Sequence, residues 1–244
     1  MTTPHNPRTS KTTVGIIYPD HAAEDDYPTA AAWLNVDLPV AHIYGTDLHA
    51  VPELLDLGRP DRLADAAARL AEHQPQAVMW ACTSGSFVYG FDGARQQAEQ
   101  LARDAGVPAA TTSQAFVAAL DALDISMVAV AASYPQEVAS LFVEYLAAAG
   151  IEVTAMSSAG IATAAEVGRL SSADVRNLAL CHDHPGAKAL LIPDTAMRTV
   201  QLLPQLEAQL KKPVLTANQV TIWHGLRLVG LQPKDERLGA LFAT

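Results

Sequence analysis

The feature that constrains the fold of this chain most is a regular alternation of short apolar runs with longer stretches of helical period. The short runs are typical of strands: Val14–Tyr18, Ala77–Ala81, Val107–Thr111, Val128–Ala132, Val153–Met156, Ala189–Ile192 and Pro213–Thr216. The longer stretches favour helices: Leu63–His73, Ala94–Ala105, Gln114–Ala122, Gln136–Ala149, Ser172–Cys181 and Val200–Leu210. Strands that alternate with helices of about ten residues indicate βαβ units. We therefore expect an α/β fold built from parallel sheets flanked by helices.

The chain also repeats itself, which predicts two similar halves. Val107–Gln114 and Lys212–Gln219 share a pattern of Pro, then Thr three residues later, then Gln after three more. The distance from the first strand of each half to a polar corner is similar too. It is 68 positions from Val14 to Cys82 in the first half and 66 positions from Val128 to Asp194 in the second. We expect the first half at residues 13–118 and the second at residues 119–221.

Composition and charge exclude several classes of protein. Half of the residues are hydrophobic and 17% are charged, which excludes a disordered chain. The formal net charge of −10 leaves no basic patch for nucleic acid and no attraction to an anionic membrane. An anionic small molecule is not excluded, because a pocket can be locally positive inside an acidic protein.

The N-terminal residues carry no sign of export. Residues 1–12 are polar, contain Pro4 and Pro7, and lack the apolar stretch of a signal peptide, so we expect a disordered tail. No run approaches the roughly 18 apolar residues that span a membrane. Two cysteines, Cys82 and Cys181, are too few for the disulfide framework of a small secreted protein. We expect a cytoplasmic protein with reduced thiols.

The candidate site follows from the expected sheets. In open parallel sheets, ligands bind beyond the carboxyl ends of the strands. Two facing halves would bring loops from both to one cleft. The loops that follow the strands are Pro19–Tyr27, Cys82–Ser86, Thr111–Gln114, Ser133–Tyr134, Asp194–Thr199 and Thr216–Gln219. Side chains that could bind or react with a ligand are expected in these segments.

The strongest local signal is Trp80–Phe87, an apolar strand that ends at Cys82 and continues through hydroxyl residues into a helical stretch. Backbone N–H groups at a helix start favour anions and can stabilise a thiolate. Thr83 and Ser84 add hydroxyl donors where a carboxylate could bind. A half-buried structural cysteine with capping hydroxyl residues is the alternative interpretation.

The second half has a corner of the same design at Ile192–Arg198. Asp194 could be a general acid or base if burial raises its pKa, or simply a helix cap. A cysteine and an aspartate on opposite walls of one cleft suit two-sided proton transfer, or a nucleophile paired with a proton donor. Tyr134, after the strand Val128–Ala132, could donate to a carboxylate. Pro19 and Thr195 complete the predicted substrate-binding set.

Other polar segments are interpreted as structural. Cys181–His184 resembles a metal-binding tract, but it precedes a strand and so falls at the end away from the cleft. We expect a solvated loop there and no metal. Glu24–Asp26 is read as a solvated acidic loop, and Arg198 as either a charge partner for substrate or a surface ion pair. No nucleotide, PLP or HExxH motif is present, so no cofactor is predicted.

These residues resemble the aspartate/glutamate racemase superfamily, most closely the branch of maleate cis-trans isomerases, arylmalonate decarboxylases and EutA-like proteins. The resemblance runs from Val14 to about Phe242. It rests on Val14–Pro19, Cys82–Ser86, Ala132–Tyr134, Gly160–Ser171, Asp194–Thr199 and Trp223–Arg227. It implies two pseudo-symmetric Rossmann-like halves with a cofactor-free site in the cleft between them. It also implies that a C-terminal helix at about residues 222–244 returns to the first half.

The resemblance implies roles for individual residues. Cys82 holds the position of the first catalytic cysteine, and Thr83, Ser84 and Tyr134 match residues that bind the substrate carboxylate. The second catalytic cysteine of the racemases and isomerases should fall at Asp194, where this chain has none. The arylmalonate decarboxylases also have a single cysteine, but in the second half, with Gly at the position of Cys82.

Several functions remain open on the sequence. The favoured one is an isomerase of small unsaturated dicarboxylates, in which the Cys82 thiolate adds to the alkene and leaves after bond rotation. The alternatives are a decarboxylase of malonates with Cys82 as the proton donor, a racemase using Cys82 and Asp194, and a carboxylate-binding protein without activity. The expected partner is a small carboxylate, and the sequence leaves open whether copies assemble as a homo-oligomer.

Overall fold

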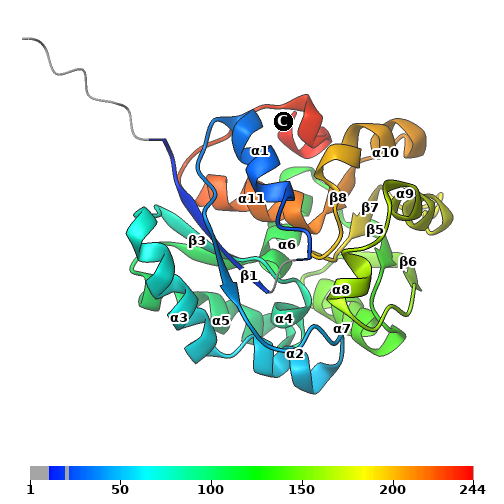
Figure 1. Ribbon diagram of the computed structural model, residues 1–244. Coiled ribbons are helices and arrows are strands. Elements are labelled where there is room, and N and C mark those ends of the chain that lie inside the picture. The colour runs from blue at the N-terminus through cyan, green and yellow to red at the C-terminus, as the bar shows by residue number, and fades with distance from the viewer. Residues whose placement is uncertain (1–10, 20–21, 244) are drawn as a thin grey trace, which may run out of the picture.

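The computed structural model describes residues 11–19 and 22–243 and contains two four-stranded parallel sheets (Figure 1). The first sheet has the order β2-β1-β3-β4, with β1 (Val14–Pro19), β2 (Val40–Ile43), β3 (Ala77–Trp80) and β4 (Ala109–Thr111). The second has the order β6-β5-β7-β8, with β5 (Met127–Ala132), β6 (Glu152–Ser158), β7 (Ala189–Ile192) and β8 (Val214–Thr216). The expected α/β fold with two halves of parallel sheet is confirmed. The predicted tail falls largely on residues outside the described part.

Helices cover both sheets. Those before β5 are α1 (Asp26–Leu34), α2 (Val51–Leu57), α3 (Pro60–Leu70), α4 (Ser84–Phe87), α5 (Gly90–Ala105) and α6 (Thr112–Ala122). Those after it are α7 (Gln136–Ala148), α8 (Ala164–Val167), α9 (Ser172–Cys181), α10 (Leu203–Leu210) and α11 (Ala217–Leu228). Strands covered on both faces are apolar at every position, and the wholly buried β3 and β7 follow this rule. Among the described residues, none of the helices is long and apolar enough to cross a membrane.

The two sheets are copies in spacing as well as in strand order. The first three strands begin at residues 14, 40 and 77 in one half and at 127, 152 and 189 in the other. The fourth strands begin at 109 and 214. The offset is therefore 112 or 113 residues for three strand pairs and 105 for the last. This regularity would have placed a strand near residue 40, where β2 was not predicted because the polar His42 interrupts its half-buried apolar run.

The repeated Pro–Thr–Gln pattern is explained by capping boxes at two equivalent helix starts. Thr111 and Thr216 precede α6 and α11, and each threonine's backbone N–H donates to the Gln three residues later at 3.0 Å. Such reciprocal pairing satisfies backbone donors that a helix start otherwise leaves without partners. The repeat is therefore a structural signal, located where strands turn into helices.

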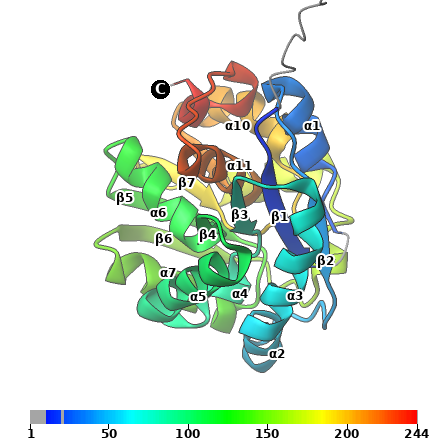
Figure 2. The same cartoon turned by 90° about the vertical axis from the view of Figure 1, so that its left-hand side faces the viewer.

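The C-terminal region differs from expectation. The predicted helix at about residues 222–244 is wrong in both bounds, because α11 begins at Ala217 and ends at Leu228. Gly230 follows with a φ of +76°, a conformation that ends helices, and Pro233 cannot donate to a helix. Figure 2 shows α11 beside α6 of the first half, and residues of these two helices are in contact. The last residues form short 3₁₀ turns at Glu236–Leu238 and Ala240–Phe242.

Aromatic side chains join the two halves. Phe87 of α4 lies 5.9 Å from Tyr134, centroid to centroid, and Phe116 of α6 lies 5.5 Å from Phe142 of α7. All four side chains are at most 1% exposed. Each pair has one ring from each half. Burial of these apolar rings therefore stabilises the contact between the two halves.

Candidate functional site

A cavity of about 100 Å³ lies beyond the carboxyl ends of the strands, with walls from both halves. The first half contributes Tyr18, Pro19, Cys82, Ser84 and the loop at residues 43–49, and the second contributes Asp194 and Thr195. Five of the predicted site residues therefore meet at one place: Pro19, Cys82, Ser84, Asp194 and Thr195. Pockets for drug-sized ligands are about 300–1,000 Å³, so this cavity suits a smaller molecule.

Cys82 follows β3 by two residues, at the turn into α4. Its side chain is 4% exposed. Its Sγ accepts the backbone N–H of Gly85 at 3.2 Å and lies 3.7 Å from the Ser84 hydroxyl oxygen. Burial raises the pKa of the thiol to about 11; the Gly85 and Ser84 contacts oppose this rise, and the negative charge of Asp194 adds to it. The helix start does not produce a thiolate here, because the loss of water around the sulfur outweighs the backbone donors.

The turn that carries Cys82 is held by neighbours from α2 and α5. The Gln97 side-chain amide donates to the carbonyl oxygens of Gly58 at 2.7 Å and of Gly85 at 3.0 Å. A Cβ at Gly58 would lie only 2.3 Å from the Gly85 oxygen, so no larger residue fits at that approach. Because Gly85 also donates to the thiol, this packing determines where the sulfur lies.

Asp194 follows β7 by two residues, in the position equivalent to Cys82. It is 3% exposed, and its carboxylate accepts the backbone N–H of Ala196 at 2.9 Å and the hydroxyl of Ser133. Both partners donate, so the carboxylate oxygens act as acceptors in these contacts. The two halves thus bring a protonated thiol and a hydrogen-bonded carboxylate to one cavity.

Thr83 and Tyr134 do not line the cavity, although both are buried close to Cys82. The Thr83 hydroxyl oxygen is buried without a hydrogen-bond partner among the described residues. The Tyr134 hydroxyl donates to the carbonyl oxygen of Pro193 at 2.7 Å. Burial, and then the charges of Asp194 and Cys82, raise the pKa of Tyr134 well above its ordinary value, so it is a donor. Neither residue is among those that line the cavity, so their contact with a substrate stays a prediction.

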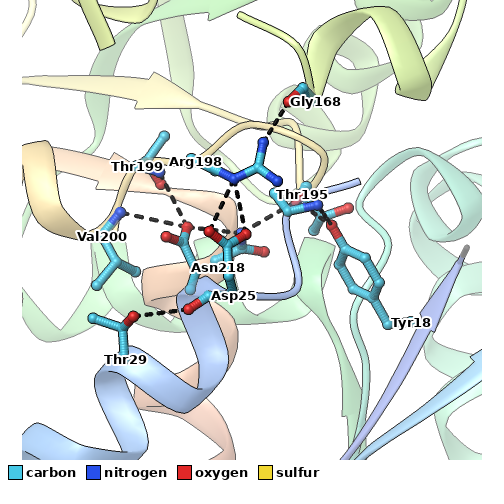
Figure 3. Close-up of polar contacts among 11 residues, drawn as sticks. Tyr18, Asp25, Thr29, Gly168, Thr195, Arg198, Thr199, Val200 and Asn218 are labelled. Carbon is cyan, nitrogen blue, oxygen red and sulfur yellow. Dashed lines mark hydrogen bonds and ion pairs between the residues drawn. The ribbon is translucent and has the colours of Figure 1, made fainter. Parts of the chain in front are cut away.

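The wall that carries Asp194 is fastened to the first half (Figure 3). The Tyr18 hydroxyl donates to the Thr195 carbonyl oxygen at 2.7 Å, and the Asn218 amide donates to the same oxygen at 3.1 Å. Asp26 accepts the same amide at 3.0 Å and the Thr199 backbone N–H at 3.0 Å. Burial raises the pKa of Asp26 to about 6 against these donors. The interpretation of Glu24–Asp26 as a solvated loop is wrong for Asp26, which is 3% exposed.

Sequence analysis missed the loop after β2. Residues 44–49 line the cavity, and His49 among them is 7% exposed. Its backbone N–H donates to Ala162 at 2.7 Å, while the Ala164 N–H donates to Asp47 at 2.8 Å. These two backbone hydrogen bonds attach the loop to the second half. The repeat offset was the available signal, because it marks β2 and hence the loop that follows its carboxyl end.

The remaining candidates lie elsewhere. Cys181 is exposed at the end of α9, and Asp183 pairs with Lys212 at 2.8 Å. In the part of the chain that the structure describes, no cluster of His, Cys, Asp or Glu could hold a metal ion. Arg198 pairs with Asp25 at 2.8 Å and donates to the Gly168 carbonyl, and Figure 3 shows it turned toward these partners.

Comparisons with known proteins find relatives that match nearly the whole chain. A family model described as arylmalonate decarboxylase matches residues 14–242. The arylmalonate decarboxylase of Bordetella bronchiseptica is 29% identical over 226 residues, covering 91% of this chain and 92% of that protein. The maleate isomerase of Pseudomonas putida is 26% identical over 183 residues, covering 72% and 73%. A crystal structure of a Pseudomonas putida maleate isomerase variant with maleate superposes with a TM-score of 0.87 at 21% identity, covering 95% and 97%.

Proposed function

The chain belongs to the arylmalonate decarboxylase family, and from that premise we propose that it decarboxylates a small malonate-type diacid, with Cys82 as the proton donor. The observation that carries this proposal is the protonated thiol. With a pKa raised to about 11, roughly one Cys82 in ten thousand is ionised at pH 7. A general acid has to hold its proton until the reaction needs it, and this thiol does.

The reaction requires few groups. The bond between the α-carbon and one carboxylate breaks, carbon dioxide leaves, and the electron pair moves into the remaining carboxylate as an enediolate. Cys82 then gives its proton to the α-carbon, and the resulting thiolate recovers a proton from water. The hydroxyl of Ser84, which lines the cavity next to Cys82, is suited to hold an enediolate oxygen.

Asp194 has a separate part in this proposal. Ser133 and Ala196 donate to its carboxylate, which leaves it as a fixed negative charge on the wall opposite the thiol. That charge adds to the effect of burial, which keeps the proton on Cys82, and it disfavours a substrate carboxylate placed against it. A leaving carboxylate that becomes neutral carbon dioxide relieves this repulsion. The size of the cavity favours a substrate with a small substituent over one with an aryl ring.

A second candidate is cis-trans isomerisation of a small unsaturated dicarboxylate. The cavity of about 100 Å³ suits a four-carbon diacid, and a maleate isomerase is among the relatives. In this reaction the Cys82 thiolate adds to the alkene, the C–C bond rotates and the thiolate leaves. It ranks second because the thiol must first lose a proton that its surroundings hold firmly.

The test compares wild type with Cys82→Ala on alkylmalonates, phenylmalonate and maleate. We expect carbon dioxide release from a small alkylmalonate, and about 10²–10⁴-fold slower turnover in the variant, as for loss of a general acid. The exposed cysteine provides the control, since Cys181→Ala should keep full activity.

The other outcomes are distinct. Conversion of maleate to fumarate, without carbon dioxide and with a covalent adduct of substrate mass on Cys82, would establish the isomerase instead. Deuterium exchange from solvent at the α-carbon of an amino or hydroxy acid, without carbon loss, would indicate a racemase. Full decarboxylation by Cys82→Ala would sink the proposed role of the thiol.

A further inference from the structure

The side chains that line the cavity carry an excess of negative charge. Asp47 and Asp194 both line it, and no Lys or Arg does among the described residues. The whole chain carries a net charge of −10. A dicarboxylate adds up to two further negative charges, and burying uncompensated like charges is costly. One lining side chain, His49, can become a cation.

The geometry of His49 leaves one of its two ring nitrogens available. Nδ1 lies 3.1 Å from the carbonyl oxygen of Ile161, and a carbonyl only accepts, so Nδ1 carries a hydrogen in this contact. Nε2 has no hydrogen-bond partner among the described residues. The ring stands perpendicular to Tyr134 with centroids 4.9 Å apart. The imidazole is therefore held in one orientation beside the cysteine turn.

We propose that His49 binds a carboxylate of the substrate. Nδ1–H remains on Ile161, and Nε2 takes up a proton when the dicarboxylate enters and donates it in a charge-assisted hydrogen bond. His49 is thus the counter-ion that lets an acidic cavity accept a dianion. This inference rests on the proposed function, because it needs a dicarboxylate as the ligand.

The described groups around His49 include two carboxylates and no other cation. The titratable groups that line the cavity with it, or contact its ring, are Tyr18, Tyr44, Asp47, Cys82, Tyr134 and Asp194. None of these is cationic, and two are carboxylates. Among the described residues no other cationic or potentially cationic side chain lines the cavity, so proton uptake on Nε2 meets no cationic repulsion from them.

The experiment measures binding of succinate by calorimetry. Succinate has two carboxylates but neither an alkene nor a malonate carbon, so neither proposed reaction consumes it. The variants are His49→Asn, which can keep the hydrogen bond to Ile161, and His49→Gln, which can keep a neutral donor near Nε2. The matched control is His42→Gln, a histidine of β2 that pairs with Glu24 and does not line the cavity. Thermal unfolding checks that each variant is folded.

The expected result has two parts. At pH 6, His49→Asn binds succinate at least about tenfold more weakly than wild type, and the loss shrinks toward pH 8 as histidine loses its charge. At pH 7, wild type and His42→Gln take up a fraction of a proton on binding, seen as heats that differ between phosphate and Tris buffers. Neither His49 variant does.

Two outcomes would overturn the inference. If both His49 variants bind within twofold of wild type with the same proton uptake, His49 is not the counter-ion, while the proposed function stands. If wild type and His42→Gln fail to bind any small dicarboxylate, the proposed function fails and the inference fails with it.

Discussion

Two opposing influences act on the proton of Cys82. Backbone and hydroxyl donors from Gly85 and Ser84 stabilise a thiolate, while removal from water and the charge of Asp194 destabilise it. Removal from water and the charge of Asp194 have the stronger effect, because a cysteine that is only 4% exposed is poorly solvated as an ion. The residue type alone suggested a nucleophile, whereas the raised pKa of the buried thiol supports its proposed role as a proton donor. This environment is what distinguishes the two leading functions.

The reactivity of the thiol follows from this. At pH 7.5, we expect iodoacetamide to alkylate Cys82 at least about a hundredfold more slowly than an ordinary cysteine, whose pKa is about 8.5. The rate should rise about tenfold per pH unit toward pH 11. Exposed Cys181 is the internal reference, read by peptide mass spectrometry. Equal alkylation of both cysteines at pH 7.5 would mean a thiolate at Cys82 and would favour the isomerase.

At the scale of elements, the same helix start occurs twice with different burial. Gln114 caps α6 and is partly exposed, whereas Gln219 caps α11 and is wholly buried. Gln219 also donates its amide to the carbonyl oxygen of Leu238 at 2.7 Å, which ties the C-terminal turns to α11. The same sequence pattern therefore caps a helix in the first half, whereas in the second half it caps a helix and also binds the C-terminal turns.

Alanine at these two positions should have unequal effects. We expect Gln114→Ala to lower the free energy of unfolding by about 1 kcal/mol, as for a lost cap. Gln219→Ala should cost more, about 2–4 kcal/mol, because it leaves buried backbone groups unpaired and a cavity behind. Urea denaturation measures both. Gln114→Glu keeps the acceptor and serves as the control; equal losses in the two alanine variants would contradict the tertiary role of Gln219.

For the whole molecule, Asp26 is one of the polar links between the halves. It lies at the start of α1 and accepts N–H groups from Thr199 and Val200, which follow β7, and from Asn218 of α11. Its burial raises its pKa to about 6, so the folded protein prefers this carboxyl neutral. The stabilisation is complete below the ordinary pKa near 3.8 and is lost as the pH rises through about 6.

Asp26→Asn should remove this pH dependence. The amide oxygen can accept the same N–H groups without a charge, so we expect the variant to gain stability relative to wild type between pH 4 and 7. The gain has an upper limit of about 3 kcal/mol, from the size of the pKa rise. Chemical denaturation at several pH values measures the difference. Asp25→Asn, at a 60% exposed side chain, is the control and should change little. A constant difference across pH would show that Asp26 is already ionised throughout.

Local patterns in the sequence determined the elements and the two-half architecture. Apolar runs such as Ala189–Ile192 mark buried strands, because a strand covered on both faces has no polar side, and helical period marks most of the long helices. Cys82 and Asp194 were singled out from the motifs that follow their strands and from the repeat spacing, because parallel strands point their carboxyl ends the same way. β2 was missed because the polar His42 interrupts its apolar run, and α1, α2, α4 and α8 were missed because helices of four to nine residues carry little periodicity.

The sequence by itself thus determined the α/β class, the internal repeat and the strand-end positions of the candidate residues. Only the tertiary structure decided the chemistry of those positions. Burial raises the pKa values of Cys82 and Asp26. The backbone hydrogen bonds between residues 47–49 and 161–164 hold His49 at the cavity. The physical reason is the distance along the sequence over which each interaction acts. Periodicity and capping act between residues close in sequence, whereas desolvation, charge and cavity shape depend on side chains that only the folded chain brings together.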